Sequence, residues 1–299
     1  MRTFLKIVAW VAGGIVGLIA VALGLVYWQS GLRLQRIYAV TVPPVRVTDD
    51  AAAIERGRHI AATRGCVDCH GQDLAGAKVI EDPAMGRLYG SNLTRGAGGL
   101  PAGYSDADFV RAIRHGVAPD GRGLFLMPSG DYAHFTENDM NDLVAYVNSV
   151  PPVDRPSVPL AIGPVARALL LAGKIRLAAD EIDHASLRPD DVAPAVTVAY
   201  GRYLAAGCTG CHGANLSGGR IEIGPPDWPL AANLTPHASG RLAAWTEADF
   251  LAALRTARRP DGTAINPVMP RAFGQMNDTE LRALWAYVRT LPPAATGVR

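Results

Sequence analysis

The apolar residues of this chain are unevenly distributed, and the longest uninterrupted stretch lies near its start. Residues 7–28 (IVAWVAGGIVGLIAVALGLVYW) contain no charge, and about 20 helical residues cross the hydrocarbon core of a bilayer. Arg2 and Lys6 precede this stretch, and Tyr27 and Trp28 close it as interfacial aromatic residues do. The pattern predicts a retained transmembrane anchor over residues 1–30. A cleaved signal peptide is the alternative, because AVA at 20–22 offers small residues for cleavage.

Beyond the anchor, apolar positions recur with helical spacing. In two segments they fall at i, i+3, i+4 and i+7: Met140, Leu143, Val144, Val147, and then Leu281, Leu284, Trp285, Val288. Capping residues precede both helices (TEND at 136–139, NDTE at 277–280), and a Pro-Pro pair ends each. Shorter helices are expected to begin near SDAD (105–108) and TEAD (246–249). No strand-like alternation persists, so the expected class is all-α.

The two halves of the chain repeat one another. SNLT (91–94) matches ANLT (232–235), YSDADF (104–109) matches WTEADF (245–250), and LVAYVNSVPP (143–152) matches LWAYVRTLPP (284–293). Such self-similarity indicates a duplicated domain. The expected organisation is an anchor at 1–30, a linker at 31–54, a first domain at 55–150, a second linker at 151–197, a second domain at 198–293 and a tail at 294–299. Within the second linker, residues 166–184 are expected to form one helix whose apolar side covers a domain surface.

Bulk composition excludes one class of partner. The 299 residues carry a formal net charge of +2 and include 19% charged residues. No run of lysines and arginines of the kind that binds phosphate backbones is present. We therefore expect no nucleic-acid partner.

All four cysteines lie in two copies of one motif. Cys66, Cys69 and His70 are matched by Cys208, Cys211 and His212. A redox disulfide would belong to a strand-containing fold, and zinc would require the two distant pairs to meet. Cys-x-x-Cys-His is the signature of covalent haem attachment, in which two thiols bind the porphyrin and the histidine binds iron. Two aligned copies that use every cysteine favour one haem c per copy.

The repeat also selects a candidate for the opposite face of each iron. Met127 and Met269 each follow their motif histidine by the same interval, and each precedes a proline. Proline stiffens a loop that could hold a thioether in place. Core packing is the alternative role for any single methionine. His115 is a less favoured candidate, because Thr256 occupies its position in the second copy.

With these motifs, the sequence resembles the class I c-type cytochromes. The segments NLT…YSDADFVRAIRHGV…PDGRGLFLMPSGDYAHFTENDMNDLVAYVNSVPP and NLTP…WTEADFLAALRTARRPDG…MPRAFGQMNDTELRALWAYVRTLPP are similar to cytochrome subunits of membrane-bound bacterial dehydrogenases for alcohols, aldehydes or sugar acids. Those subunits carry three haem motifs, whereas this chain has two. The resemblance implies two tandem cytochrome c-like domains behind a transmembrane helix. It also implies that the four cysteines form thioether bonds to haem. It further implies that the iron is bound by His70, His212, Met127 and Met269.

The function expected from this resemblance is single-electron transfer. Haem attachment outside the cytoplasmic membrane implies a single-pass protein of the bacterial cytoplasmic membrane with both domains in the periplasm. Electrons would come from a dehydrogenase or quinol-oxidising complex of a respiratory or photosynthetic chain and pass towards a terminal acceptor. The redox partner could be a dehydrogenase, an oxidase, another cytochrome or a larger complex that holds the chain as a subunit. The alternative is a dihaem enzyme, a peroxidase or a thiosulfate-type dehydrogenase, which would need a vacant position on one iron.

Overall fold

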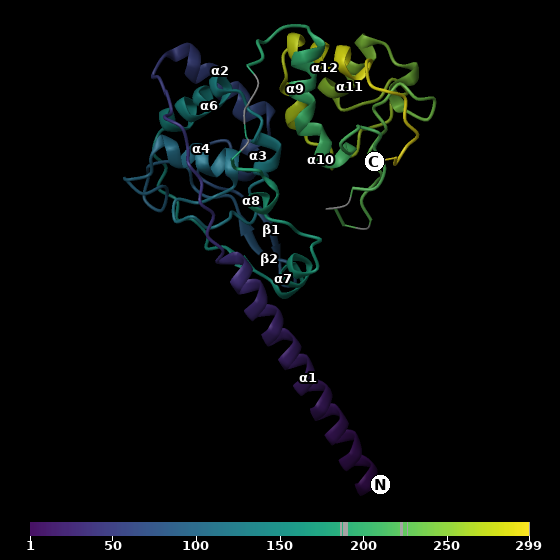
Figure 1. Cartoon of the computed structure of the whole chain (residues 1–299). Coiled ribbons are helices and arrows are strands. Elements are labelled where there is room, and N and C mark those ends of the chain that lie inside the picture. Colours follow the sequence, from purple (N-terminus) through teal and green to yellow (C-terminus); the bar gives the residue numbers. More distant parts are fainter. Residues whose placement is uncertain (186, 188–190, 222–223, 226, 299) are drawn as a thin grey trace.

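The computed structural model describes residues 1–185, 187, 191–221, 224–225 and 227–298. Nearly all of its regular structure is helical, which confirms the predicted class. One long N-terminal helix leads into two helical domains that lie side by side at its far end (Figure 1).

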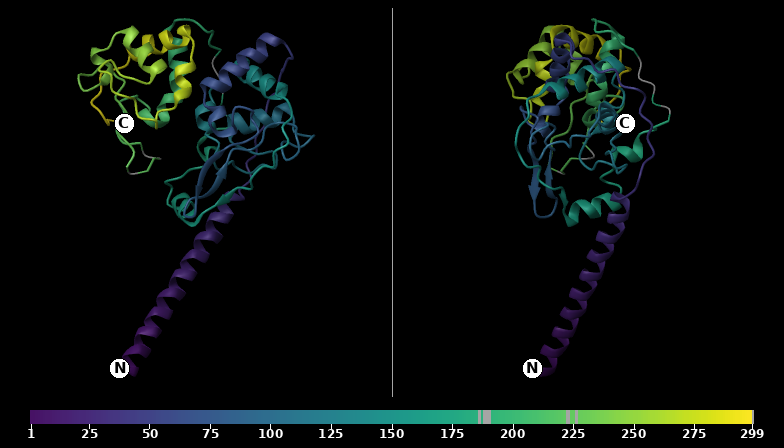
Figure 2. Two further views of the ribbon diagram at one scale, coloured as in Figure 1. Left: turned by 180° about the vertical axis from the view of Figure 1, so that it is seen from behind. Right: turned by 90° about the vertical axis from the view of Figure 1, so that its left-hand side faces the viewer.

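The N-terminal helix α1 (Arg2–Leu34) extends away from both domains (Figure 2). Its most apolar window has a mean hydropathy of 2.4, and none of that window is buried. By length and composition, α1 is able to cross a membrane. Only its last turns touch the rest of the protein, where Ser30 is fully buried.

The end of α1 is joined to the segment between the domains by direct contacts. Arg33 Nη1 donates to the carbonyl of Leu170 at 2.8 Å. Arg36 and Tyr38 both donate to the carboxylate of Asp180, at 2.9 and 2.7 Å. The chain that follows lies along the first domain, where three side chains pack against its core: Val42, Val45 and Val47.

The two domains are built from corresponding elements. The first contains α2 (Ala51–Thr63), α3 (Cys66–His70), α4 (Asp106–His115), α5 (Ser129–Tyr132) and α6 (Glu137–Ser149). The second contains α9 (Val198–Ala205), η1 (Ala206–Cys208), α10 (Thr209–His212), η2 (Arg241–Ala244), α11 (Glu247–Thr256), η3 (Arg271–Gln275) and α12 (Asp278–Val288). Each domain has its own buried core, around Met140 and Val144 in the first and around Leu281 and Leu284 in the second.

The predicted helix starts are confirmed. The Thr136 side chain accepts a hydrogen bond from Asp139 N at 3.0 Å, and Asn277 accepts one from Glu280 N at 3.0 Å. The shorter helices α4 and α11 begin with capping boxes formed by Ser105 with Asp108 and by Thr246 with Asp249. These bonds satisfy amide groups that the first turn of a helix leaves unpaired.

In each domain two helices cross at a glycine. Gly57 of α2 faces α6, and Gly201 of α9 faces α12. A Cβ on Gly57 would lie 1.9 Å from the carbonyl oxygen of Asp142, and one on Gly201 would lie 1.9 Å from that of Ala283. Only glycine lets the two backbones approach so closely. The crossing fixes the relative position of the two helices, and the motif follows directly after the first of them.

A small antiparallel sheet was not predicted. It has the strand order β1 (Lys78–Asp82), β2 (Gly86–Tyr89) and β3 (Ala161–Ile162). The hairpin of β1 and β2 belongs to the first domain, and β3 comes from the segment between the domains. Strands of two to five residues are too short to show a clear alternation of apolar and polar positions.

The single helix expected over residues 166–184 is wrong. The structure has two shorter helices, α7 (Pro164–Leu171) and α8 (Ala178–Glu181). Gly173 adopts a φ of +68°, a left-handed conformation that ends helices. The expected apolar side does cover protein, because Leu170 and Leu177 are fully buried.

The domains meet through two equivalent contacts. His59 and Tyr203 each lie two residues after the crossing glycine of their domain, and Asp139 and Glu280 occupy equivalent places near the start of the last helix. His59 Nε2 lies 2.7 Å from Glu280 Oε2, and the Tyr203 hydroxyl donates to the carboxylate of Asp139. Arg64 joins the first contact, with its guanidinium 4.0 Å from Glu280 Oε1 and only 8% of its side chain exposed. The interface is therefore close to two-fold symmetric.

Candidate haem sites

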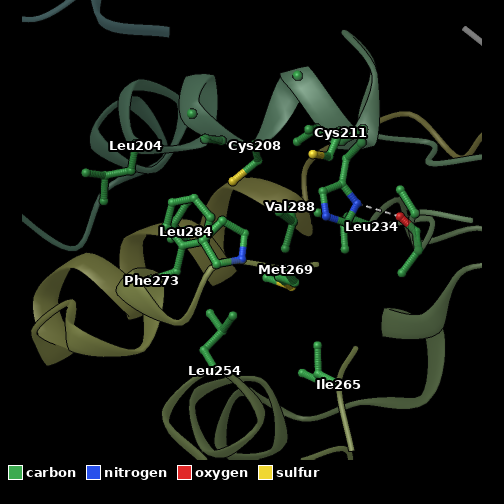
Figure 3. A pocket seen from close by; sticks show the side chains of 18 of the residues that line it. Leu204, Cys208, Cys211, Leu234, Leu254, Ile265, Met269, Phe273, Leu284 and Val288 are labelled. Carbon is green, nitrogen blue, oxygen red and sulfur yellow. Dashed lines mark hydrogen bonds between the residues drawn. The ribbon is translucent and has the colours of Figure 1, made fainter. Parts of the chain in front are cut away.

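The motif of the second domain lies on one short turn. Cys208 ends η1, and Cys211 and His212 lie on α10, which stops at Gly213 with a φ of +80°. Figure 3 shows the two cysteines along one edge of a pocket. Their sulfur atoms are thus presented from one turn, as attachment to a single planar ring requires.

This pocket is large and mainly apolar. Its volume is about 920 Å³. Leu204, Leu254, Ile265, Phe273, Leu284 and Val288 surround it (Figure 3). Met269 lines the same pocket from the loop before η3. The structure therefore brings together all four residues predicted for this site, from two segments more than 50 residues apart in the sequence.

The orientation of the His212 ring suits iron binding. Its Nδ1 lies 2.7 Å from the carbonyl oxygen of Ala232, so this nitrogen carries the proton and donates it. Burial lowers the pKa of His212, although the carbonyl bond acts in the opposite direction. The imidazole is thus neutral, and Nε2 keeps the lone pair that a metal needs.

A buried asparagine follows the residue whose carbonyl orients the histidine. Asn233 follows Ala232, donates from Nδ2 to the carbonyl of Ala294 at 2.7 Å, and accepts from Thr235 N at 2.8 Å. The tail after residue 293 is therefore held against the second domain. Sequence reasoning matched the NLT segments of the two copies but assigned them no role.

The first domain repeats this support. His70 Nδ1 lies 2.9 Å from the carbonyl oxygen of Ser91. The next residue, Asn92, is buried and donates to the carbonyls of Val153 and Arg155, at 2.9 and 3.0 Å. Burial lowers the pKa of His70 despite the opposing carbonyl bond. Both motif histidines thus have the same tautomer, which a hydrogen bond from Nδ1 to a backbone carbonyl sets in each domain.

The remaining residues predicted to bind haem in the first domain are Cys66, Cys69 and Met127, and they do not all lie in one pocket. Cys66 and Met127 both pack against the core of this domain. Cys69 lies instead on the wall of the pocket of the second domain. Burial raises the pKa of the Cys66 thiol to about 12 and that of Cys208 to about 11, so both are protonated at neutral pH.

Residues of the first domain complete the wall of the second pocket. Besides Cys69, they include Arg64, Asp131, Tyr132 and His134. A Cβ on Gly210, within the second motif, would lie 3.8 Å from Asp131 Oδ1. The two motif segments therefore approach each other across the domain interface. Sequence reasoning missed this arrangement because it considered each copy alone.

Histidines outside the motifs have other partners. His115 Nδ1 lies 3.1 Å from His184 Nδ1, and His237 Nδ1 lies 2.8 Å from Ser239 Oγ. His134 packs edge-on against the Tyr203 ring. Burial, together with the positive charge of Arg64, lowers the pKa of His134 to about 4. These contacts account for the histidines that the repeat left without a counterpart.

The residues present fit haem c. Across the described ranges, no group of three or more His, Cys, Asp or Glu side chains is placed to hold an ion. The second pocket instead offers two thiols on one turn, one neutral imidazole with a free nitrogen, one thioether and an apolar lining. That donor set matches a covalently attached porphyrin.

Sequence comparison agrees with this fold and donor set. The profile of the Cytochrome c family matches residues 54–151 and 198–292. The chain therefore belongs to the cytochrome c family, whose members bind haem c. The resemblance predicted from the motifs is confirmed.

Three relatives refine the comparison. Over 289 residues the chain is 28% identical to the fructose dehydrogenase cytochrome subunit of Gluconobacter japonicus, covering 87% of this chain and 57% of that subunit. It is 30% identical to the gluconate 2-dehydrogenase cytochrome c subunit of Pantoea cypripedii, covering 80% and 60%. It is 26% identical to a diheme cytochrome c-type protein of Cereibacter sphaeroides, covering 91% and 96%. The chain thus spans less than two thirds of the two dehydrogenase subunits and nearly all of the diheme protein.

Proposed function

We propose that this protein is a membrane-anchored cytochrome with two covalently bound haem c groups that carries single electrons. Haem c, when bound, supplies an iron that changes between its ferrous and ferric states. In the proposal, Cys66 and Cys69 hold one haem, and Cys208 and Cys211 hold the other. The observation that carries the proposal is the pocket of the second domain, which Cys208, Cys211, His212 and Met269 line together.

In this function the protein side chains hold and tune the cofactor. His70 and His212 would each provide Nε2 to the iron, because a backbone carbonyl already binds Nδ1. Met127 and Met269 would each provide a thioether sulfur to the same iron as the histidine of their domain. A methionine–histidine pair gives a higher reduction potential than a pair of histidines. The apolar lining of the second pocket excludes water and also disfavours the added charge of the oxidised state.

The domain interface supports electron transfer within the chain. Cys69 and Asp131 of the first domain lie on the wall of the second pocket. An electron that reaches one domain would therefore have a short route to the other without leaving the protein. The paired contacts His59–Glu280 and Tyr203–Asp139 would hold this arrangement during turnover.

The relatives suggest the class of donor. Two of them are cytochrome subunits of fructose and gluconate dehydrogenases. We propose that this chain likewise accepts electrons from a membrane-associated dehydrogenase or a quinol-oxidising complex. The helix α1 would anchor it in the bacterial cytoplasmic membrane, with both domains in the periplasm, and electrons would leave towards a terminal acceptor of a respiratory or photosynthetic chain.

A redox titration followed by visible spectroscopy tests the proposal. The purified protein should contain two haem groups that titrate at high potential and show the charge-transfer band of methionine–iron ligation. Met269→Leu should remove this band from one haem and lower the potential of that haem. Met276→Leu is the matched control, because Met276 is buried in the core of the same domain and should leave both unchanged. Iron that is five-coordinate or bound by two histidines in both domains would contradict the assignment.

A further inference from the structure

The short helix α7 is apolar except for one side chain, which faces α1. Residues 164–172 (PVARALLLA) contain a single charge, that of Arg167. Ala166 and Leu170 are fully buried against protein, whereas Val165, Ala168 and Ala172 are exposed. A helix of a water-exposed surface normally has a polar outer face, and one that is apolar all round is covered by protein or lipid.

The position of α7 indicates which of these covers it. Arg167 turns towards α1, where Nη1 donates to Ser30 Oγ at 2.9 Å and the guanidinium lies 4.6 Å from the centre of the Tyr27 ring. Tyr27 and Trp28 end the charge-free stretch of α1. The helix α7 therefore lies at the level where α1 would leave a bilayer. Figures 1 and 2 show it beside the upper end of α1, at the base of the first domain.

Three hydrogen bonds fix the direction in which α7 faces. Its first turn is held by the hairpin, where Val165 N donates to the carbonyl of Ala84 at 3.0 Å and Gly163 N donates to that of Met85 at 2.9 Å. Its last turn is held by α1, through the bond from Arg33 to Leu170. The helix cannot rotate to bury its exposed side in the domain without breaking these bonds.

We infer that α7 is an interfacial helix whose exposed side, formed by Val165, Ala168 and Ala172, rests at the boundary between the headgroups and acyl chains of the membrane. Interfacial helices commonly bury an apolar face about 5–10 Å into this boundary. The exposed Lys174 follows the helix and would lie among lipid phosphates. The inference rests on the proposed function only in assuming that α1 is inserted in the bilayer.

Spin labels on the full-length protein in phospholipid nanodiscs test this placement. Labelled cysteines replace Val165 and Ala168 in separate variants (Val165→Cys, Ala168→Cys), and the control is Val198→Cys. Val198 lies in the second domain and is 44% exposed, against 45% for Val165. Leu18→Cys in α1 reports whether the anchor is inserted. Power saturation is measured with O₂, which concentrates in lipid, and with a water-soluble nickel chelate. Each value is taken relative to the same variant under nitrogen, so that relaxation by haem iron cancels.

The expected result is a severalfold higher ratio of O₂ to nickel accessibility at Val165 and Ala168 than at Val198. Equal ratios at all three positions would overturn the inference. Protection of Val165 and Ala168 from both reagents would also overturn it, because protein and not lipid would then cover α7. A lipid-type signal at Leu18 combined with a water-type signal at Val165 would leave the anchor intact and reject only the role of α7. A water-type signal at Leu18 would reject the anchor itself.

Discussion

The two domains share their helix crossing and the support of their motif histidine, and they differ in the elements around this common part. Both have a glycine where the first and last helices cross, at Gly57 and Gly201. Both have a buried asparagine next to the carbonyl that orients the motif histidine, at Asn92 and Asn233. The two domains are therefore alike where two helix backbones are in contact and where hydrogen bonds fix the motif histidine. These positions define the domain more sharply than its apolar pattern does.

The elements outside this common part make different contacts in the two domains. The first domain adds the hairpin of β1 and β2, which pairs with β3 and holds α7 next to α1. The motif turn of the second domain lies against the first domain, and residues of both domains line the pocket of the second domain. Residues 55–150 contain 9 basic and 12 acidic side chains, whereas residues 198–299 contain 10 and 7. The domains thus have opposite net charge.

Removal of either cysteine pair should have the largest effect. Cys208→Ala combined with Cys211→Ala should leave one haem per chain, because each domain has a complete motif. Cys66→Ala combined with Cys69→Ala should do the same for the first domain. The pyridine haemochrome absorbance per mole of protein measures the content. Loss of both haems from either double variant would show that the domains do not load independently.

Adding a methyl group at either helix crossing should be nearly as damaging. Gly57→Ala and Gly201→Ala each place a Cβ 1.9 Å from a backbone oxygen, so the helices must separate. The expected loss is about 3 kcal/mol or more of the free energy of unfolding, measured by guanidinium denaturation. Gly130→Ala and Gly207→Ala are controls, since no heavy atom lies within 4 Å of a Cβ at either position. Equal effects in all four variants would reject the crossing argument.

The interface contacts should contribute less, and by similar amounts. His59→Ala and Tyr203→Phe each remove the partner of a carboxylate in the other domain. Tyr203→Phe also removes the acceptor of the backbone N–H of Thr136, at 3.4 Å. Each should cost about 1–3 kcal/mol of the unfolding free energy. Arg58→Ala is the control, because Arg58 pairs on the surface with Glu55 within the same helix. A cost in only one of the two interface variants would show that the interface is not functionally symmetric.

The first of these contacts should depend on pH. Burial raises the pKa of Glu280, but the hydrogen bond with His59 and the charge of Arg64 outweigh it, so the pKa lies below its ordinary value of 4.5. A lowered carboxyl pKa stabilises the folded state above pH 4.5, and this contribution is lost as the pH falls through the folded value. The difference in unfolding free energy between the wild type and Glu280→Gln should therefore shrink between pH 6 and pH 3. A constant difference would contradict this electrostatic account.

The smallest expected effect is a gain in stability. The helix α4 ends at Gly116 with a φ of +65°, whereas α11 ends at Ala257 with a φ of +52°. A left-handed conformation costs a residue with a Cβ about 1–2 kcal/mol. Ala257→Gly should therefore raise the free energy of unfolding by about 1 kcal/mol, and Gly116→Ala should lower it. Thermal unfolding followed by circular dichroism measures both.

The sequence predicted local features well and features made by distant contacts poorly. The apolar stretch of α1, the caps at Thr136 and Asn277 and the duplicated motif all depend on residues within a few positions of each other. The end of α7 at Gly173 is also local, because a glycine followed by lysine is a common helix end, and it could have been predicted. The sheet could not, since β3 reaches β2 from more than 70 residues away.

The same distinction applies to the candidate sites. Pairing the two copies identified the residues that line the second pocket, and their roles as ligands stay a prediction. The carbonyls of Ser91 and Ala232 carry no side-chain signal, because any residue supplies a carbonyl. Arg64 has no equivalent in the second copy, so a search based on the repeat passed over it. Its role depends on Glu280, which lies more than 200 residues further along the chain.

The bonds from Arg33, Arg36 and Tyr38 to the segment between the domains have a consequence for the proposed exchange of electrons. A carrier on a long flexible tether visits its donor and acceptor in turn. Here α1 is fastened to the rest of the protein by short bonds, so under the proposed function the fold would set the height of both haem groups above the lipid. The sites of exchange on the partner proteins would then lie at that height, and diffusion within the plane of the membrane would bring them together.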